Sequence, residues 1–194
     1  MRLILDTNFS NIWFKPLSGI FLILSGCVGV APGITPITEF ELERYLGRWY
    51  EIARLDHSFE RGLDNVTAEY SLRSDGGVAV VNRGYSRKGD DWKTAEGKAY
   101  FVSGENVAHL KVSFFGPFYG SYVIFELERK GYEYAFVTSH KKSYLWLLSR
   151  SPSVGQEVID KFLRTARKFG FQTSDLIFVG QSRHALPVNE INSD

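Results

Sequence analysis

The sequence has few of the residues from which metal sites and covalent cross-links are built. It has one cysteine, one methionine and four histidines in 194 residues. The histidines are too scattered for the HxH or HExxH spacing of a metal site. A single thiol excludes an internal disulfide, so packing must hold the folded body together. No GxSxG segment precedes a helix and no phosphate-binding glycine loop is present, so we expect neither catalysis nor a metal or cofactor.

The sequence also lacks a surplus of one charge and a long apolar run. The formal net charge is +1, and without Arg2, Asp6 and Lys15 the 23 basic and 22 acidic residues become 21 of each. A nucleic-acid-binding domain usually has a basic surplus, so we expect no nucleic-acid partner. The apolar run from Leu17 to Leu24 is shorter than the roughly 20 residues that a membrane-spanning helix needs.

The single cysteine, Cys27, follows this short apolar run directly. Ser25 and Gly26 supply small residues before it, and Arg2 and Lys15 supply positive charge upstream. This arrangement is typical of a bacterial lipoprotein signal peptide, in which the cysteine takes a lipid before cleavage. We therefore expect residues 1–26 to be removed and Cys27 to be lipidated. The alternative is a buried N-terminal helix with an incidental cysteine.

Three segments are expected after cleavage. Residues 27–38 are expected to form a lipidated tether, because the stretch 31–38 contains two prolines and a glycine without a hydrophobic period. Residues 39–183 have the length of one domain with one core, and residues 184–194 form a flexible tail. Val28, rather than aspartate, follows the cysteine, which favours the outer membrane in bacteria with two membranes.

Most of the domain has the pattern of short β-strands. From Arg48 onward, segments rich in Val, Tyr, Phe and Ile alternate with turn clusters, as in an all-β barrel or sandwich. Seven breaks delimit eight strands, and their spacing leaves no room for crossover helices, so neighbouring strands should pair antiparallel. The breaks lie at residues 58–64, 74–77, 88–91, 104–106, 116–120, 129–131 and 140–142.

One amphipathic helix is expected after the eighth strand. Ser153 and Gln156 have the spacing of a capping box, and Gly170 is a typical helix end. The polar face mixes both charges, so we expect the helix to pack on the outside of a barrel rather than on a membrane. Its apolar stripe consists of Val154, Val158, Phe162, Ala166 and Phe169. A short strand over 176–180 should follow.

Alternation within four strands predicts which side chains face the barrel interior. Small residues at 95, 97 and 99 favour an open cavity, because an eight-stranded barrel either fills with side chains or holds one small ligand. The alternative is that bulky residues such as Tyr70 or Phe125 fill this space. The predicted inward residues are Val66, Ala68, Tyr70 and Leu72; Ala95, Gly97, Ala99 and Phe101; Leu110, Val112 and Phe114; and Val123, Phe125 and Leu127.

The two ends of the strand region carry a family signature. The segment 47–50 reads Gly-Arg-Trp-Tyr, and the segment 147–152 ends the last strand with an arginine. The chain resembles the lipocalins, whose signatures are a GxW in the first strand and this arginine, here Gly47, Trp49 and Arg150. The fold is then an eight-stranded antiparallel up-and-down β-barrel with one C-terminal α-helix outside. Trp49 and Arg150 should meet at the closed end as a structural cation–π pair, worth roughly 0.5–2 kcal/mol.

Longer runs are similar to bacterial outer-membrane lipocalins related to apolipoprotein D. The middle lipocalin signature, a Thr-Asp-Tyr, is degraded here to Glu128-Arg129-Lys130 and Tyr132. The resemblance implies a lipid anchor in the outer membrane, a periplasm-facing barrel, and binding of fatty acids and lysophospholipids to store or move lipids during envelope stress. It also implies a possible homodimer. The similar runs are 49–57, 59–62, 82–85, 96–101, 111–120 and 144–146.

The loops at the barrel mouth supply candidate contacts for a lipid head group. We expect an acyl chain inside the barrel and its carboxylate or phosphate near cations of the rim. Lys141 and Lys142 could equally be a solvated turn, and Phe118 and Tyr119 a lid, a membrane-touching tip or ordinary packing. The mouth candidates are Phe59, Arg61, Phe118, Tyr119, Lys141 and Lys142.

Three competing functions remain open at this point. The first is a carrier of haem, bilin or another chromophore, although no histidine has a predicted inward position. The second is an enzyme of the lipocalin fold that uses Tyr70 or an inward carboxylate. The third is a structural anchor protein with a filled barrel.

Overall fold

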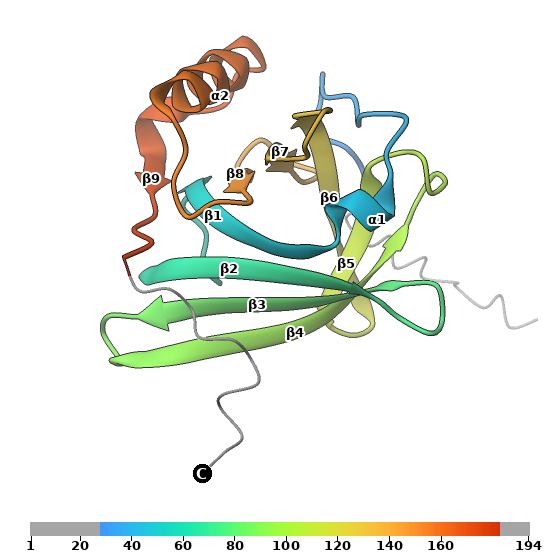
Figure 1. The fold of residues 1–194 in the computed structure, drawn as a ribbon, viewed down its shortest axis with the longest axis horizontal. Helices are drawn as coiled ribbons and strands as arrows, with labels where there is room; N and C mark the ends of the chain where they lie inside the picture. The colour runs from blue at the N-terminus through green and yellow to red at the C-terminus, as the bar shows by residue number, and fades with distance from the viewer. Residues whose placement is uncertain (1–27, 183–194) are drawn as a thin grey trace, which may run out of the picture.

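A computed structural model describes residues 28–182 of the chain (Figure 1). Within these residues, nine strands form one antiparallel sheet in the order β2-β3-β4-β5-β6-β7-β8-β1-β9, and pairing of β1 with β2 closes it into a barrel. The predicted lipidation of Cys27, the removal of residues 1–26 and the tail at 184–194 lie outside the described residues. The strands are β1 (Gly47–Leu55), β2 (Leu63–Leu72), β3 (Val78–Ser86), β4 (Asp91–Phe101), β5 (His109–Phe115), β6 (Phe118–Leu127), β7 (Tyr134–Thr138), β8 (Leu145–Ser149) and β9 (Leu176–Phe178).

The prediction of an eight-stranded up-and-down barrel is confirmed. From β1 to β8, each strand pairs antiparallel with the next one in the chain, and β1 joins β8 through Tyr50 and Ser149. The closing pair of β1 and β2 sets Trp49 opposite Ala68. A short helix, α1 (Leu42–Tyr45), lies at the end of the barrel where β1 begins (Figure 1). We call this the closed end, and the opposite end the mouth.

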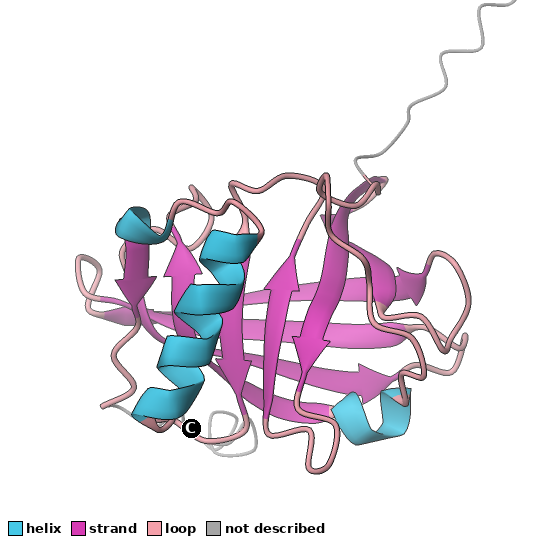
Figure 2. Cartoon of the chain, turned by 90° about the horizontal axis from the view of Figure 1, so that it is seen from above, coloured by secondary structure: helices cyan, strands magenta, loops and turns pink. Residues whose placement is uncertain are grey.

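The second helix, α2 (Gln156–Lys168), lies against the outside of the sheet (Figure 2). It buries Phe162 and Ala166, two residues of the predicted stripe. The predicted cap is wrong, because Gly155 takes the N-cap position and no side chain caps the helix. Its backbone oxygen accepts from the N–H groups of Val158 and Ile159, so the chain at Ser153 is still outside the helix. A short 3₁₀ helix, Thr173–Asp175, leads into β9. No described helix has the length and apolar composition to span a membrane.

Two apolar clusters hold the molecule together. The inner cluster fills part of the barrel and includes Trp49, Tyr70 and Leu110. The outer cluster lies between the sheet and α2 and includes Phe136 and Phe162. Apolar side chains therefore occupy both faces of several strands, as expected where a helix covers a sheet.

The segment before α1 packs on the barrel instead of standing off from it. Ala31 and Ile34 are buried in the outer cluster, and the Ala31 N–H donates to the backbone oxygen of Ser139 at 3.1 Å. Further along, Ile37 N–H donates to the oxygen of Ile124 at 3.0 Å. The expectation of a loose tether is therefore wrong for residues 31–38, because these apolar side chains find buried positions.

Candidate functional site

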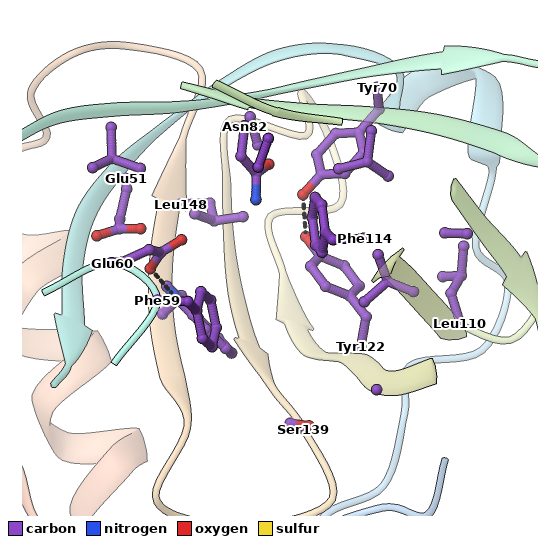
Figure 3. A pocket seen from close by; sticks show the side chains of 18 of the residues that line it. Glu51, Phe59, Glu60, Tyr70, Asn82, Leu110, Phe114, Tyr122, Ser139 and Leu148 are labelled. Carbon is purple, nitrogen blue, oxygen red and sulfur yellow. Dashed lines mark hydrogen bonds between the residues drawn. The ribbon is translucent and has the colours of Figure 1, made fainter. Parts of the chain in front are cut away.

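A cavity of about 570 Å³ lies inside the barrel (Figure 3). It lies within the ~300–1,000 Å³ range of ligand-binding pockets in general. Apolar side chains make up most of its wall, and further residues from β1, β3 and the mouth loops complete it. Eight predicted inward residues line it: Val66, Ala68, Tyr70, Ala95, Ala99, Leu110, Val112 and Phe114.

Three predicted inward residues of β2 and β4 do not line the cavity. A Cβ atom at Gly97 would lie 2.8 Å from the ring of Phe114, so the space beside this glycine is filled by that ring. Phe101 packs against Phe40 at the closed end, with ring centroids 6.1 Å apart. Leu72 is 56% exposed at the last position of β2, so its prediction as a cavity residue is wrong.

The predicted faces of β6 are also wrong. Val123 and Phe125 belong to the outer cluster, where the Phe125 ring stacks 5.8 Å from that of Phe171. Tyr122 and Ile124 instead contact the inner cluster. The helix covers the outer face of β6, so both faces carry apolar residues and alternation alone cannot tell them apart. A β-bulge between Ile124 and Glu126 then returns Leu127 to the inner cluster, and Phe125 fills none of the cavity.

The residues of the family signature lie together at the closed end. The Arg150 guanidinium carbon lies 4.1 Å from the centroid of the Trp49 ring. Its two terminal nitrogens donate to the backbone oxygens of Arg48 at 2.9 Å and Arg44 at 2.7 Å. Gly47 has φ of +87°, and a Cβ there would be 3.6 Å from Arg150. The predicted pair therefore ties α1, β1 and the end of β8 together.

Three tyrosine side chains meet at the inner side of this closed end. The Tyr122 hydroxyl lies 2.7 Å from the Tyr45 hydroxyl and 2.9 Å from the Tyr70 hydroxyl. All three line the cavity. Burial raises the pKa of each phenol, so all three are neutral hydroxyl groups. We call Tyr45, Tyr70 and Tyr122 the tyrosine triad; the sequence alone predicted only Tyr70.

A second polar group on the cavity wall contains two buried glutamates, Glu51 and Glu60 (Figure 3). Arg54 donates to Glu51 Oε1 at 2.6 Å and to the backbone oxygen of Glu60 at 2.9 Å. Trp146 Nε1 donates to Glu60 Oε2 at 3.1 Å, and His57 Nε2 lies 2.9 Å from the same oxygen. Sequence analysis missed this cluster, although Glu51 has the same strand parity as Trp49 and alternation places it inward.

The pKa values of the two glutamates are shifted in opposite directions. Burial raises the pKa of Glu51 well above the ordinary value of 4.5, and the nearby Glu60 charge raises it further, against the pull of Arg54. Burial also acts to raise the pKa of Glu60, but the contacts with His57 and Trp146 outweigh it and the pKa is lowered. The Arg54 guanidinium pairs with only one of the two carboxyl groups, and on acidification Glu51 takes up a proton before Glu60 does.

The mouth of the cavity is aromatic. Phe59 is 60% exposed and Phe118 is 69% exposed, and both line the opening together with Tyr119. Phe115, 81% exposed, also lines it and was missed, because its strand alternation had been read only to Phe114. Phe59 sits on the loop between β1 and β2, and the other three sit at the adjoining ends of β5 and β6, which the up-and-down topology brings to the same end of the barrel.

The predicted rim cations are not those that line the cavity. Arg61 pairs with Asp56 at 2.6 Å, and Lys141 and Lys142 are absent from the cavity wall. Arg83 and Lys93, on the neighbouring strands β3 and β4, line it instead. Arg83 was missed because the faces of its strand could not be assigned. Lys93 was missed because the inward alternation of its strand was followed only from Ala95, although Lys93 has the same parity. Within residues 28–182, no group of three potential ligands for a metal ion is found.

Comparisons with known proteins agree with this architecture. The family model for the lipocalin-like domain matches residues 40–181. The outer membrane lipoprotein Blc of Vibrio cholerae serotype O1 is 57% identical over 170 residues, which cover 85% of this chain and 99% of that protein. The protein of the same name from Escherichia coli strain K12 is 49% identical over 163 residues, covering 83% of this chain and 91% of that one.

More distant proteins have the same fold. Mouse apolipoprotein D is 31% identical over 158 residues, covering 76% of this chain and 82% of that protein. The structure of insecticyanin from the tobacco hornworm matches with a TM-score of 0.65 at 23% identity, covering 81% of this chain and 89% of that one. Matches of this extent, together with the barrel, the Trp49–Arg150 pair and the cavity, place the chain in the lipocalin family.

Proposed function

We propose that this protein is a lipid-anchored outer-membrane lipocalin that binds fatty acids and lysophospholipids, one acyl chain at a time, inside its barrel. Its role would be to store or move membrane lipids during envelope stress. The observation that carries the proposal is the largely apolar cavity of about 570 Å³, which is lined at the closed end by Phe40 and the tyrosine triad and lies behind an aromatic mouth at the other end. A binding protein needs such a cavity, and an acyl chain matches its chemistry.

The apolar wall sets how tightly and how selectively a lipid would bind. Burial of a sixteen-carbon chain is worth roughly 12 kcal/mol at about 0.8 kcal/mol per methylene, before the cost of ordering the chain. The chain then contributes most of the affinity, and the head group contributes less. We therefore expect fatty acids and lysophospholipids of similar chain length to bind with similar affinities.

Head-group contacts are assigned to the cations that reach the cavity rim. Arg83 and Lys93 line the opening and can donate charge-assisted hydrogen bonds to a carboxylate or a phosphate. The Arg83 guanidinium also lies 5.5 Å from the centroid of the Trp92 ring, which holds it near the mouth. Lys141 and Lys142 do not line the cavity, so no head-group contact is assigned to them.

The position of the N-terminal segment supports a mouth that faces the membrane. The backbone N–H of Ala31 donates a hydrogen bond to the backbone oxygen of Ser139, and Ser139 lines the cavity at its open end. Four residues of extended chain span at most ~14 Å, so a lipid on Cys27 would hold the barrel close to the bilayer. The relatives named outer membrane lipoprotein favour the same anchor and the outer membrane as its location.

Gentle purification of the lipidated protein, followed by native mass spectrometry and lipid extraction, tests the proposal. We expect one bound lipid per protein molecule, with the mass of a fatty acid or a lysophospholipid. Recovery of a chromophore would support the carrier of haem or bilin instead, and turnover of the lipid would support an enzyme. The homodimer implied by the family resemblance is tested in the same spectrum by the mass of the intact assembly.

A further inference from the structure

The tyrosine triad places polar groups where an apolar chain end would otherwise lie. We propose that the triad is a polar subsite that hydrogen-bonds a hydroxyl or carbonyl oxygen carried near the inserted end of the acyl chain. The inference rests on the proposed function, in which the chain enters the barrel with its head group at the mouth. The inference adds a ligand class, namely acyl chains that carry an oxygen atom near their inserted end. A purely apolar closed end would bind such chains poorly.

The triad is assembled from three separate elements and held rigidly. Tyr45 comes from α1, Tyr70 from β2 and Tyr122 from β6. The Tyr45 ring packs 4.6 Å from the Trp49 ring, and Trp49 Nε1 donates to the backbone oxygen of Tyr45 at 2.8 Å. The Tyr70 ring lies 5.5 Å from that of Tyr45. Because these rings are fixed by packing, their hydroxyl groups stay in place before any ligand arrives.

A count of hydrogen bonds shows capacity for a ligand. Each phenol has one O–H donor and lone pairs that accept. The three hydroxyl groups make two hydrogen bonds with one another, both through Tyr122. These two hydrogen bonds use two of the three O–H protons, so one O–H proton remains. No further partner for the three hydroxyl groups is found within residues 28–182. The cavity is the space into which that proton and the remaining lone pairs can point.

The charge of the triad and its surroundings favour a neutral oxygen. The phenols are neutral because burial raises the pKa of each one. Arg150 lies behind the triad, with its charge directed at the Trp49 ring and at two backbone oxygens. In the view of Figure 3, Tyr70 and Tyr122 lie apart from Glu51 and Glu60. A hydroxyl group suits this site best, since it can accept a hydrogen bond from the remaining phenol O–H and donate one to a phenol lone pair.

The test is a cycle of two ligands and two proteins. Hexadecanoic acid and its ω-hydroxy derivative are titrated into the native protein and into the triple variant Tyr45→Phe/Tyr70→Phe/Tyr122→Phe. Shorter fatty acids and their ω-hydroxy derivatives are titrated as well, so that for one chain length the terminal hydroxyl group reaches the tyrosine triad. The variant keeps all three rings, and replacing every partner in a hydrogen-bond group leaves no orphaned hydroxyl. Tyr134→Phe is the matched control, because its hydroxyl accepts from Lys161 outside the cavity.

For the best-matched chain length, the native protein and the Tyr134→Phe control should bind the ω-hydroxy acid within about threefold of its parent. The triple variant should bind the parent acid normally and the ω-hydroxy acid about tenfold or more weakly, because the buried hydroxyl then has no partner. An equal penalty in native and triple-variant proteins would overturn the triad inference. Failure of the native protein to bind either acid would overturn the proposed function instead.

A position scan on the native protein gives the same answer without relying on the variant to fold. The hydroxyl is moved from the chain end toward the middle, to the level of Val112, an apolar wall residue that pairs with Gly120 two positions closer to the mouth than Tyr122. We expect a loss of about tenfold for the mid-chain hydroxyl, since the burial of an unpaired hydroxyl is costly. Equal affinities at all positions would contradict a polar subsite at the floor.

Discussion

The two sides of the barrel wall are packed in opposite ways. Outside, Phe136, Phe162 and Leu145 are fully buried between the sheet and α2. Inside, the inner cluster leaves a cavity of about 570 Å³ and places neutral phenols and buried glutamates on its wall. Close packing is what a core needs for stability, whereas an unfilled interior is what a ligand needs. The difference indicates that the outer cluster contributes most to stability and the inner surface to binding.

The largest expected effect is on the outer cluster. Phe162→Ala removes a fully buried ring and leaves a hole between α2 and β7. We expect a loss of about 3–5 kcal/mol in the free energy of unfolding, measured by urea denaturation. Phe178→Ala, at an exposed ring on β9, should cost about 0.5 kcal/mol or less. Equal costs for the two variants would contradict the assigned role of the outer cluster.

The closed end should show an intermediate effect. Arg150→Met removes the contact with the Trp49 ring and two hydrogen bonds to backbone oxygens. We expect the free energy of unfolding to fall by about 2 kcal/mol, because charged hydrogen bonds and a cation–π contact are both lost. Lipid affinity of the folded variant should stay within threefold of native, since Arg150 does not line the cavity. An unchanged unfolding curve would show that the pair is not a structural tie.

Filling the cavity should separate binding from stability. Ala95 lines the cavity, and Ala95→Phe places a ring in open space. We expect the unfolding free energy to change by about 1 kcal/mol or less while affinity for hexadecanoic acid drops more than tenfold. Ala79→Phe, on β3 outside the cavity wall, is the matched control and should bind normally. Unimpaired binding by Ala95→Phe would place the ligand elsewhere.

The smallest effect concerns pH. Glu51 has a raised pKa in the folded protein, so stability falls as the pH rises from its ordinary 4.5 toward the raised value, where the folded state must give up the proton. Glu51→Gln keeps an acceptor for Arg54 and removes this titration. We expect the variant to gain stability relative to native over that pH range and to show no gain below about pH 4.

Glu128 supplies a control with the opposite sign. Its carboxylate accepts from the backbone N–H groups of Gly131 and Lys130, which lower its pKa. The stability it contributes is present above its ordinary pKa and is lost as the pH falls, so Glu128→Gln should lose stability at neutral pH. Parallel pH profiles for Glu51→Gln and Glu128→Gln would contradict the raised pKa of Glu51.

Sequence pattern was sufficient for the barrel and its closing contact. Eight strands, one outer helix and the proximity of Trp49 and Arg150 follow from turn spacing, one change of hydrophobic period and the up-and-down topology. These features are local or repeat at every turn, so each segment carries its own signal.

The side chains that face the barrel interior could not be predicted from the sequence to the same extent. In β6 both faces are apolar, so only the packing of α2 decides that Val123 points outward. The triad depends on which residues of α1, β2 and β6 share one level of the barrel, which is a property of strand register and not of any one segment. Polar residues inside the wall also break the apolar pattern on which the predictions relied, as is common at functional sites.

Calorimetric titration of the native protein with a sixteen-carbon lysophospholipid, beside Ala95→Phe, tests the central claim most directly. The account predicts one lipid per chain, a negative heat-capacity change from burial of the acyl chain, and at least a tenfold loss of affinity in Ala95→Phe. Absence of binding to the native protein, or equal binding by both proteins, would contradict a lipid site inside the barrel.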